Sequence, residues 1–340
     1  MKAMILAAGF GTRFLPLTKY LPKPLLPFFN KPMILHTLEW LKSNDIRQVI
    51  INLHHLGERI YQAVGDGRSL GMEISYSWEK EILGTGGGVK KAADFFQGKR
   101  FILVNSDVFV NLDIAPLMDY HQRKGSAATM FLVEDDIQRY GGIGIDQEGK
   151  IVSVPWRKNN AASYRQGVFS GLHILEPEIL SYLPEGFSCI NKNGYQALLE
   201  RNLPVYGYFA AQAAEYPLWC DLGEVGSYLA AHWKLLKSGF PARLGYRQVS
   251  PGIWCRAKES LPDEGQFIPP VLIGHKCSIA PDCQIGPNLI LGEGTKVAGS
   301  VKISSSVILP ESVIPPDSEF RSRLWGNNIV YGGEISLNGV

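Results

Sequence analysis

The sequence has little net charge, no paired-cysteine motif and no long apolar run, and each shortage removes a class of proteins. Its 34 Lys and Arg residues nearly balance 32 Asp and Glu residues, leaving a formal net charge of +2 at pH 7. The basic stripe that nucleic-acid binding requires is therefore missing. The apolar start, Met1–Ala8, is followed directly by Gly9 and soon by Arg13. We expect a buried strand there, with neither a secretion signal nor a membrane span.

Cysteine and histidine are equally sparse. The five cysteines are odd in number and include no Cys-x-x-Cys pair, which predicts reduced thiols in a cytoplasmic protein. Cys277 and Cys283 lie one six-residue repeat apart and are expected to fill an interior rather than form a disulfide or bind metal. The histidines, including the adjacent His54 and His55, have no metal-ligand spacing and no nucleophilic partner. We expect them to be structural.

The 340 residues are enough for one large or two ordinary domains, and their first part alternates apolar runs with helical patterns. The expected strands are Met4–Leu6, Val49–Leu53, Ile74–Ser77, Phe101–Asn105, Ala128–Val133, Gly142–Ile145, Phe169–Leu175 and Val205–Phe209. Apolar residues at helical spacing predict helices around 34–41, 89–96 and 225–236, the last ending at Gly239. Such alternation predicts an α/β fold with a Rossmann-like mixed, mainly parallel sheet.

The composition and periodicity of the sequence change after residue 239. Pro and Gly punctuate residues 240–265 without a period, which predicts a linker. From 266 onwards aliphatic or aromatic residues recur every six positions: Phe267, Ile273, Ile279, Ile285, Leu291, Val297, Ile303 and Leu309. This period resembles that of hexapeptide-repeat left-handed β-helices, with each of these side chains pointing inward. We therefore expect a catalytic domain over 1–239, a linker over 240–265, and a short parallel β-helix with a C-terminal tail over 266–340.

The densest group of chemically active residues follows the first strand. A strand that enters a Gly-rich turn exposes backbone N–H groups to phosphate oxygens, and Arg13 and Lys23 add positive charge nearby. A dinucleotide fingerprint would need a third Gly where Phe14 stands, and a Walker loop would need Gly-Lys-Ser/Thr. On Gly9 and Gly11 alone, a glycine turn with surface cations would be the simpler interpretation.

The whole string across residues 7–25 closely resembles the G-x-G-T-R-x-x-P-L-T…P-K-P-L motif of the sugar-1-phosphate nucleotidylyltransferases, with Ala8 where that family commonly has Gly. The resemblance extends over essentially the whole chain. It implies catalytic roles for Arg13 and Lys23. It also implies nucleotide contacts from the loop residues Leu6, Ala7, Ala8, Gly9, Gly11 and Thr12.

Residues 79–87 resemble the base-binding segment of the family, which implies nucleotide contacts from Glu79, Gly84, Thr85 and Gly86. Taken alone, Thr85 is equally compatible with a helix cap and Glu79 with a solvated charge. A carboxylate at position 79 can accept hydrogen bonds from the base edge. Guanine offers two such N–H groups and uracil one, which favours guanine.

Two acids complete the nucleotide half of the expected site. Asp107 emerges at the carboxyl end of an apolar strand, where ligands bind in open parallel sheets, although a turn-forming Asp is the alternative. Asp221 lies in Trp219-Cys220-Asp221-Leu222-Gly223, which resembles the W-x-D-x-G element of the family. The resemblance implies that both carboxylates hold a catalytic Mg²⁺, an ion that keeps water and phosphate ligands as well.

The sugar half departs from the family. Asn105, Gly141 and Gly171 lie in segments that resemble its sugar pocket, but the usual Glu-Lys-Pro is replaced by a run in which Arg157 or Lys158 is the candidate substitute. The segment 188–192 also lacks the acid that many relatives carry. Both departures leave the sugar open.

These patterns lead to one expectation with several alternatives. The chain should transfer a nucleoside monophosphate from an NTP to a sugar 1-phosphate and release pyrophosphate, with GTP and mannose 1-phosphate as first choice. UTP with glucose 1-phosphate or N-acetylmuramate 1-phosphate is the runner-up, and a regulatory homologue is a third interpretation. A second, acyltransferase activity in the repeats has only His275 as a candidate, so we expect the repeats to serve packing or homo-oligomer formation.

Overall fold

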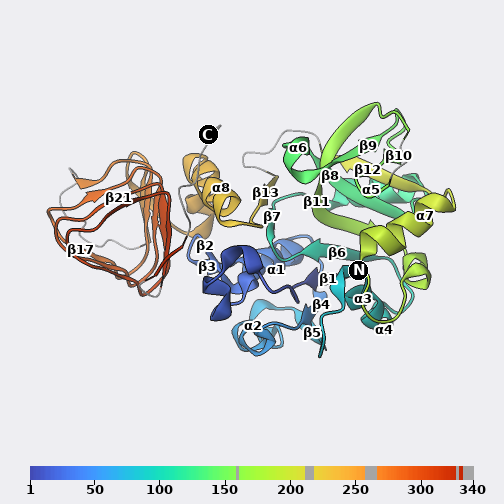
Figure 1. Cartoon of the computed structure of the whole chain (residues 1–340), viewed down its shortest axis with the longest axis horizontal. Helices are drawn as coiled ribbons and strands as arrows, with labels where there is room; N and C mark the ends of the chain where they lie inside the picture. The colour runs from blue at the N-terminus through green and yellow to red at the C-terminus, as the bar shows by residue number, and fades with distance from the viewer. Residues whose placement is uncertain (158–160, 211–217, 257–265, 327–328, 332–340) are drawn as a thin grey trace. The chain divides into compact units, whose positions relative to one another are not determined.

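The computed structural model describes residues 1–157, 161–210, 218–256, 266–326 and 329–331 (Figure 1). The chain forms two compact units. The first comprises Met1–Phe10, Pro22–Pro24 and Ile34–Ala213, and the second comprises Gly11–Leu21, Leu25–Met33 and Ala214–Val340. Two short N-terminal segments thus group with the second unit, and the expected division at residue 239 stays a prediction.

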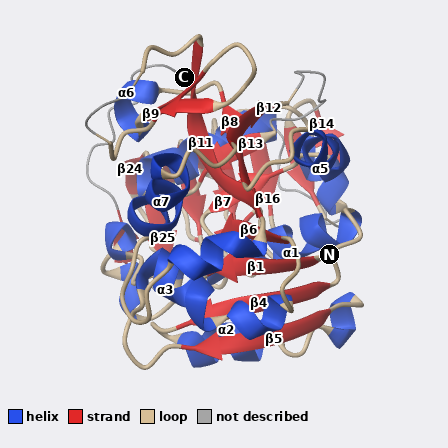
Figure 2. Ribbon diagram, turned by 90° about the vertical axis from the view of Figure 1, so that its right-hand side faces the viewer, coloured by secondary structure: helices blue, strands red, loops and turns tan. Residues whose placement is uncertain are grey.

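A nine-stranded mixed sheet forms the centre of the first unit, in the order β10-β9-β11-β6-β1-β4-β5, with β8 and β12 attached through β11. Figure 2 looks onto β6, β1, β4 and β5, which lie side by side and run parallel. The strands of this sheet are β1 (Lys2–Leu6), β4 (Gln48–Leu53), β5 (Glu73–Trp78), β6 (Phe101–Asn105), β8 (Ala128–Val133), β9 (Gly142–Ile145), β10 (Ile151–Ser153), β11 (Arg165–Leu175) and β12 (Val205–Phe209), while the short β7 (Val108–Val110) lies outside it. Every strand expected in this region is present.

The two helices predicted in this region are present, one of them interrupted, and further helices accompany them. The helices are α1 (Met33–Ser43), α2 (Gly57–Val64), α3 (Gly84–Lys91), α4 (Ala93–Phe96), α5 (Ile114–Arg123), α6 (Ile137–Tyr140) and α7 (Gln196–Glu200). The expected helix over 89–96 is divided at Ala92, whose φ of −86° and ψ of 6° end α3 before α4 begins. Val89 and Phe96 still reach the same buried core, so the apolar spacing is satisfied by two helices.

The parallel register brings three strand ends to one edge of this sheet. Leu6 at the end of β1 is paired with Asn52 on β4 and with Asn105 at the end of β6. The apolar residues of these strands are buried, except for Leu6, which is partly buried. The chain leaves each strand at the same edge, so the loops that follow β1 and β6 are neighbours.

In the second unit three sheets, parallel except for the edge strands β14 and β26, coil into a β-helix, the orange-red part of Figure 1. One sheet contains β14 (Arg247–Ser250), β15 (Ile253–Cys255), β16 (Val271–Ile273), β19 (Leu289–Leu291), β22 (Ser306–Ile308), β25 (Leu324–Gly326) and β26 (Ile329–Tyr331). The others contain β17 (Ser278–Ile279), β20 (Lys296–Val297) and β23 (Val313–Ile314), and β18 (Gln284–Ile285), β21 (Lys302–Ser304) and β24 (Glu319–Arg321). β14 and β15 lie within the expected linker, and β15 pairs directly with β16.

The six-residue period fails at one position. Ile273 pairs with Leu291, but Leu291 pairs with Ile308 rather than with Leu309. The later coil is therefore one residue shorter, and Ile308, not Leu309, joins the buried core of the β-helix. Leu309 instead contacts the position of Gly326, where a Cβ would lie 2.4 Å from its side chain.

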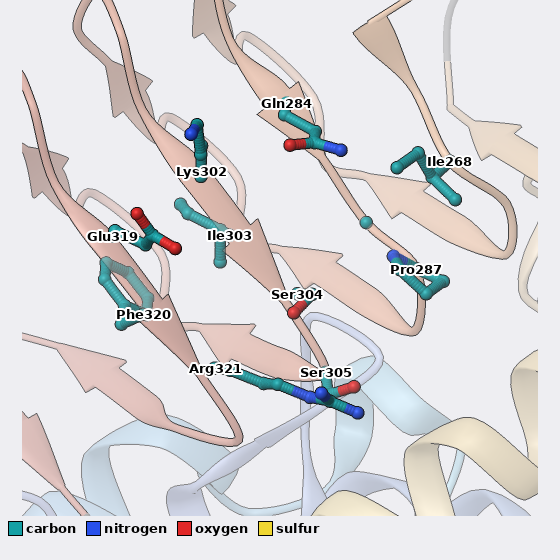
Figure 3. A pocket seen from close by; sticks show the side chains of 11 residues that line it. Ile268, Gln284, Pro287, Lys302, Ile303, Ser304, Ser305, Glu319, Phe320 and Arg321 are labelled. Atoms are coloured by element: carbon teal, nitrogen blue, oxygen red, sulfur yellow. The ribbon is translucent and has the colours of Figure 1, made fainter.

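One face of the β-helix carries an open hollow lined by both polar and apolar residues (Figure 3). Gln284, Lys302 and Glu319 occupy matching positions on β18, β21 and β24, and all three are exposed.

All five cysteines are thiols. Cys277 and Cys283 donate to the carbonyls of Gly292 and Ala298 within the coils.

The remainder of the second unit surrounds α8 (Val225–Lys237), which follows β13 (Trp219–Asp221). A hairpin of β2 (Pro27–Phe28) and β3 (Lys31–Pro32) packs on it, with the Tyr228 hydroxyl donating to the carbonyl of Pro27. At the hairpin turn the Asn30 amide donates to Tyr246 Oη at 3.1 Å and to the Leu291 carbonyl at 3.2 Å.

Candidate functional site

The Gly-rich loop leaves β1 at the sheet edge described above. The N–H of Ala7 donates to Asn52 Oδ1 at 2.8 Å, which fixes the first residue after the strand. Ala8 is buried, whereas Gly9 and Phe10 are exposed, and nothing lies within 4 Å of the place a Gly9 Cβ would take. The loop therefore presents accessible backbone at the edge where the parallel strands end, as a phosphate-binding turn requires.

Glu79, expected to meet the base, is buried at 5% exposure. Its Oε1 accepts from Asn52 Nδ2 at 2.7 Å, and its Oε2 accepts from the N–H of Leu83 at 2.9 Å. Its backbone carbonyl lies 2.9 Å from His54 Nδ1, and the His54 ring contacts Phe10 edge-on at 5.3 Å between centroids. Both carboxylate oxygens thus already accept hydrogen bonds from the protein.

The segment after Glu79 begins α3 with glycines because another loop approaches it closely. A Cβ at Gly84 would lie 2.5 Å from the Ser188 carbonyl oxygen, and one at Gly86 would lie 2.6 Å from Ser188 Oγ. The Gly86 N–H donates to that carbonyl at 2.9 Å, and Thr85 Oγ1 accepts from the N–H of Ile190 at 3.0 Å. Thr85 therefore fastens the 188–190 loop to the start of α3.

Lys23 and Asp107 form an ion pair in the first unit. Lys23 Nζ lies 2.7 Å from Asp107 Oδ2, with the lysine side chain 11% exposed and the carboxylate 35% exposed. Asp107 follows β6, and the N–H of Ser106 donates to the carbonyl of Leu6 at 3.1 Å, which ties this turn to the end of β1. A cation and a carboxylate expected at the reacting phosphate are thereby in contact.

Arg13 and Asp221 belong to the second unit and approach each other there. A Cβ at Gly223 would lie 2.7 Å from Asp221 Oδ1 and 3.3 Å from Arg13 Nη1, so only glycine leaves room for both side chains. The Gly223 N–H donates to Asp221 Oδ1 at 2.8 Å. Gly11, with φ of 64°, precedes a short turn (Thr12–Phe14), in which Thr12 and Arg13 are exposed.

The residues expected at the sugar lie in different surroundings. Asn105 contacts the backbone of β11 at Gly171, whose φ is +83° and where a Cβ would lie 2.8 Å from Asn105 Nδ2. The register between β11 and β8 shifts at this position. Gly141 ends α6 against Pro155, and the N–H of Arg157 donates to the carbonyl of Val154. Lys158 lies outside the described residues.

Behind this region, His173 on β11 is hydrogen-bonded to Tyr195 at 2.7 Å between Nδ1 and the hydroxyl. Burial lowers the pKa of His173 to about 3 and raises the pKa of Tyr195 well above its usual value. The pair is therefore neutral at physiological pH, and no proton transfer to a substrate is expected from it.

Sequence reasoning missed the structural roles of three residues in this region: Asn52, Ser188 and Gly223. Asn52 was visible as an amide within an otherwise apolar strand, IINL. Ser188 was noted only for the missing acid beside it, and its buried hydroxyl has no partner among the described residues. Gly223 was recognised as the last residue of the W-x-D-x-G element, but only the structure shows that it leaves room for Asp221 and Arg13.

The carboxylates of Asp107 and Asp221 are suitable ligands for a divalent metal ion that prefers oxygen ligands. In the part of the chain that the structure describes, no three His, Cys, Asp or Glu side chains gather as a metal site. Mg²⁺ does not require such a cage, because one or two carboxylates with phosphate and water ligands suffice.

No helix among the described residues has the length and apolarity to cross a membrane.

Comparison with known proteins agrees with the fold. The profile of the family described as nucleotidyl transferase matches residues 2–238. The UTP–glucose-1-phosphate uridylyltransferase of Synechocystis is 31% identical over 271 residues, which cover 75% of this chain and 67% of that protein. The mannose-1-phosphate guanylyltransferase of Mycobacterium tuberculosis is 27% identical over 277 residues, 80% of this chain and 73% of that protein.

Among solved structures, HddC from Yersinia pseudotuberculosis, complexed with GMP-PN, is similar. Its TM-score is 0.55 at 25% identity, and the match covers 68% of this chain and 97% of that one.

Proposed function

Because the chain belongs to the nucleotidyl transferase family, we propose that it joins a nucleoside triphosphate to a sugar 1-phosphate, with GTP and mannose 1-phosphate as its substrates. The contact between Lys23 and Asp107 carries the proposal. Lys23, the proposed catalytic cation, and Asp107, the proposed metal ligand, are in contact at the sheet edge where the Gly-rich loop begins, which supports the proposal.

The reaction is an in-line displacement at phosphorus. An oxygen of the sugar 1-phosphate attacks the α-phosphorus of the NTP, the bond from that phosphorus to the bridging oxygen breaks, and pyrophosphate leaves with its electron pair. The nucleophile is already an anion, so no general base is needed. The chain's residues therefore have to align two anions and offset their charge.

Each cation has its own part in that task. Lys23 brings the α-phosphate and the sugar phosphate together, and Arg13 binds the leaving β- and γ-phosphates. The loop from Ala7 to Gly11, whose exposed residues are Gly9 and Phe10, receives phosphate oxygens, while the segment Gly84–Gly86 faces the base. Asn105, Gly141 and Gly171, with Arg157 or Lys158, are proposed to form the sugar side.

We assign the divalent metal as Mg²⁺, with Asp107 and Asp221 as its protein ligands. When bound, such an ion neutralises charge on the transferring phosphate. The assignment of both acids to one ion rests on their family motifs, and Asp107 supports it by offering a partly exposed carboxylate.

The choice of GTP rests on the guanylyltransferase relatives, and the runner-up, UTP with glucose 1-phosphate, rests on the Synechocystis relative. A matrix of four NTPs against a panel of sugar 1-phosphates with Mg²⁺, scored by pyrophosphate release, decides between them. The highest kcat/KM for GTP and mannose 1-phosphate is the expected result. A higher value for a UTP pair selects the runner-up, and no release from any pair favours a regulatory homologue.

The metal assignment has its own test. Asp107→Asn should lower kcat at least a hundredfold, because loss of one charged ligand weakens electrostatic stabilisation of the transition state. Asp119→Asn, an exposed acid on α5, serves as the matched control. Near-normal turnover in Asp107→Asn refutes the assignment.

A further inference from the structure

We propose that Glu79 is a positioning residue that acts through Asn52, and that this buried pair couples the phosphate loop to the base-binding segment. The proposal rests on the proposed function. It gives Glu79 a task other than accepting hydrogen bonds from a base, which is the role expected from the sequence.

The first half of the coupling leads to the phosphate loop. Glu79 Oε1 accepts from Asn52 Nδ2 at 2.7 Å, and Asn52 Oδ1 accepts from the N–H of Ala7 at 2.8 Å. An amide that donates on one side and accepts on the other is thereby fixed in orientation. The carboxylate that follows β5 therefore determines, through β4, where the chain leaves β1.

The second half leads to the start of α3. Glu79 Oε2 accepts from the N–H of Leu83 at 2.9 Å, and Leu83 precedes the glycines that open the helix. One carboxylate thus holds both segments that are proposed to contact the nucleotide.

The pair is closed off from solvent. Asn52 is 2% exposed and Glu79 is 5% exposed. A Cβ at Gly88 would lie 2.9 Å from Asn52 Nδ2 and 2.9 Å from Glu79 Oε1, so the helix covers them with no space for a methyl group. Buried hydrogen bonds to a charged group are stronger than exposed ones, and leaving a partner unsatisfied there is costly.

This arrangement allows an exchange of polarity between the two side chains. In Glu79→Gln, one oxygen has to serve two donors, Asn52 Nδ2 and the Leu83 N–H. In Asn52→Asp, two carboxylates face each other. In the double variant every bond can form again, because the amide introduced at position 79 donates to the carboxylate introduced at position 52. That carboxylate still accepts from the Ala7 N–H, and the oxygen of the new amide accepts from the Leu83 N–H.

The test measures NTP kinetics and amide hydrogen exchange for the two single variants, the double variant and the control Glu58→Gln, an exposed acid on α2. Each single variant should raise the KM for NTP by about tenfold or more, because it loses one buried hydrogen bond. The factor should be the same for every NTP that the wild type uses. The double variant should recover most of that loss. A double variant no better than the worse single one overturns the proposal, as does a loss confined to guanine nucleotides.

Hydrogen exchange provides a readout that does not depend on turnover. Exchange in peptides around Ala7 and Leu83 should accelerate in each single variant and slow again in the double variant, with β-helix peptides unchanged. Unaltered exchange at both places refutes the coupling. If the wild type releases no pyrophosphate with any substrate pair, the proposed function fails while exchange still decides this inference. If a single variant is insoluble, the double variant decides the test. A folded double variant with wild-type hydrogen exchange supports the coupling, and one that does not fold or exchanges faster refutes it.

Discussion

At the scale of single residues, Lys23 depends on its surroundings for its position. Buried prolines stand on both sides of it, and its ammonium is held by Asp107 at 2.7 Å. The ion pair is mostly buried on the lysine side, so its geometry is better defined than that of an exposed pair. The charge is thereby kept at the sheet edge before any substrate arrives.

Lys23→Met should lower kcat about a hundredfold, because a positioned charge at a reacting phosphate contributes that much to the transition state. Lys19→Met, which removes an exposed lysine from the same N-terminal region, should change kcat little. Steady-state kinetics with saturating Mg²⁺ measures both. Equal effects from the two variants would show that only general positive charge matters.

At the scale of elements, the hydrogen bond from His173 to Tyr195 joins β11 to a helical turn, η6 (Ile190–Tyr195). His173 has a pKa of about 3 in the folded chain, because burial disfavours its charged form, against 6.5 when unfolded. The unfolded chain therefore binds more protons between these values. Stability is complete above pH 6.5 and falls as the pH drops towards 3.

This linkage predicts that the free energy of unfolding falls by about 2 kcal/mol between pH 7.5 and pH 5 through His173 alone, because the unfolded chain binds a proton there and the folded chain does not. His173→Gln keeps a hydrogen-bonding group for Tyr195 but does not titrate. Urea unfolding of both proteins at the two pH values measures the difference, and the variant should lose about 2 kcal/mol less. Parallel losses in the two proteins would contradict the assignment.

The coils of the β-helix leave no room at their glycine corners. A Cβ at Gly292 would lie 2.3 Å from the nitrogen of Pro310 and 2.4 Å from the carbonyl carbon of Leu309, both backbone atoms of the next coil. Gly292→Ala should therefore destabilise the full chain by about 3 kcal/mol, the upper end of overpacking effects. Ala298→Gly changes the equivalent repeat position the other way and should cost at most about 1 kcal/mol. Chemical unfolding of both variants checks the contrast.

Sequence periodicity predicted the elements well because each depends on local spacing. The apolar runs of the central sheet and the six-residue repeat correspond directly to buried rows. The sequence did not predict that Ile308, rather than Leu309, occupies the inward position of its coil. The coil loses one residue within Ser304–Ser306, where every side chain is small, so the apolar spacing in the sequence is not interrupted. The partners of Glu79 were missed for a related reason, since Asn52 lies on another strand and only the parallel register brings the two together.

At the scale of the whole molecule, the predicted division at residue 239 has to accommodate an N-terminal segment that groups with the C-terminal residues. The hairpin around Phe29 and Asn30 belongs with the C-terminal unit. Phe29 is 2% exposed and contacts Phe240 with centroids 5.5 Å apart, while Asn30 donates to Tyr246 and Leu291. No local pattern predicts contacts of such long range.

Removal of residues 240–340 should therefore lower the melting temperature and leave Phe29 exposed, rather than release an intact catalytic domain. A chain ending at Tyr331 is the control. Thermal unfolding with light scattering compares the three proteins, and aggregation is expected only for the shorter chain. An unchanged melting temperature and unchanged turnover after the large deletion would show that the division at 239 is the functional one.

The hairpin contacts also govern the order in which the protein can be completed during synthesis. Asn30 and Leu291 are separated by 261 residues, so the hairpin emerges from the ribosome long before its last partner exists. Non-local contacts of this kind form late, because the entropy of closing the intervening chain opposes them. The growing chain carries an uncovered aromatic turn through most of its translation, and this turn is a natural site for chaperone capture.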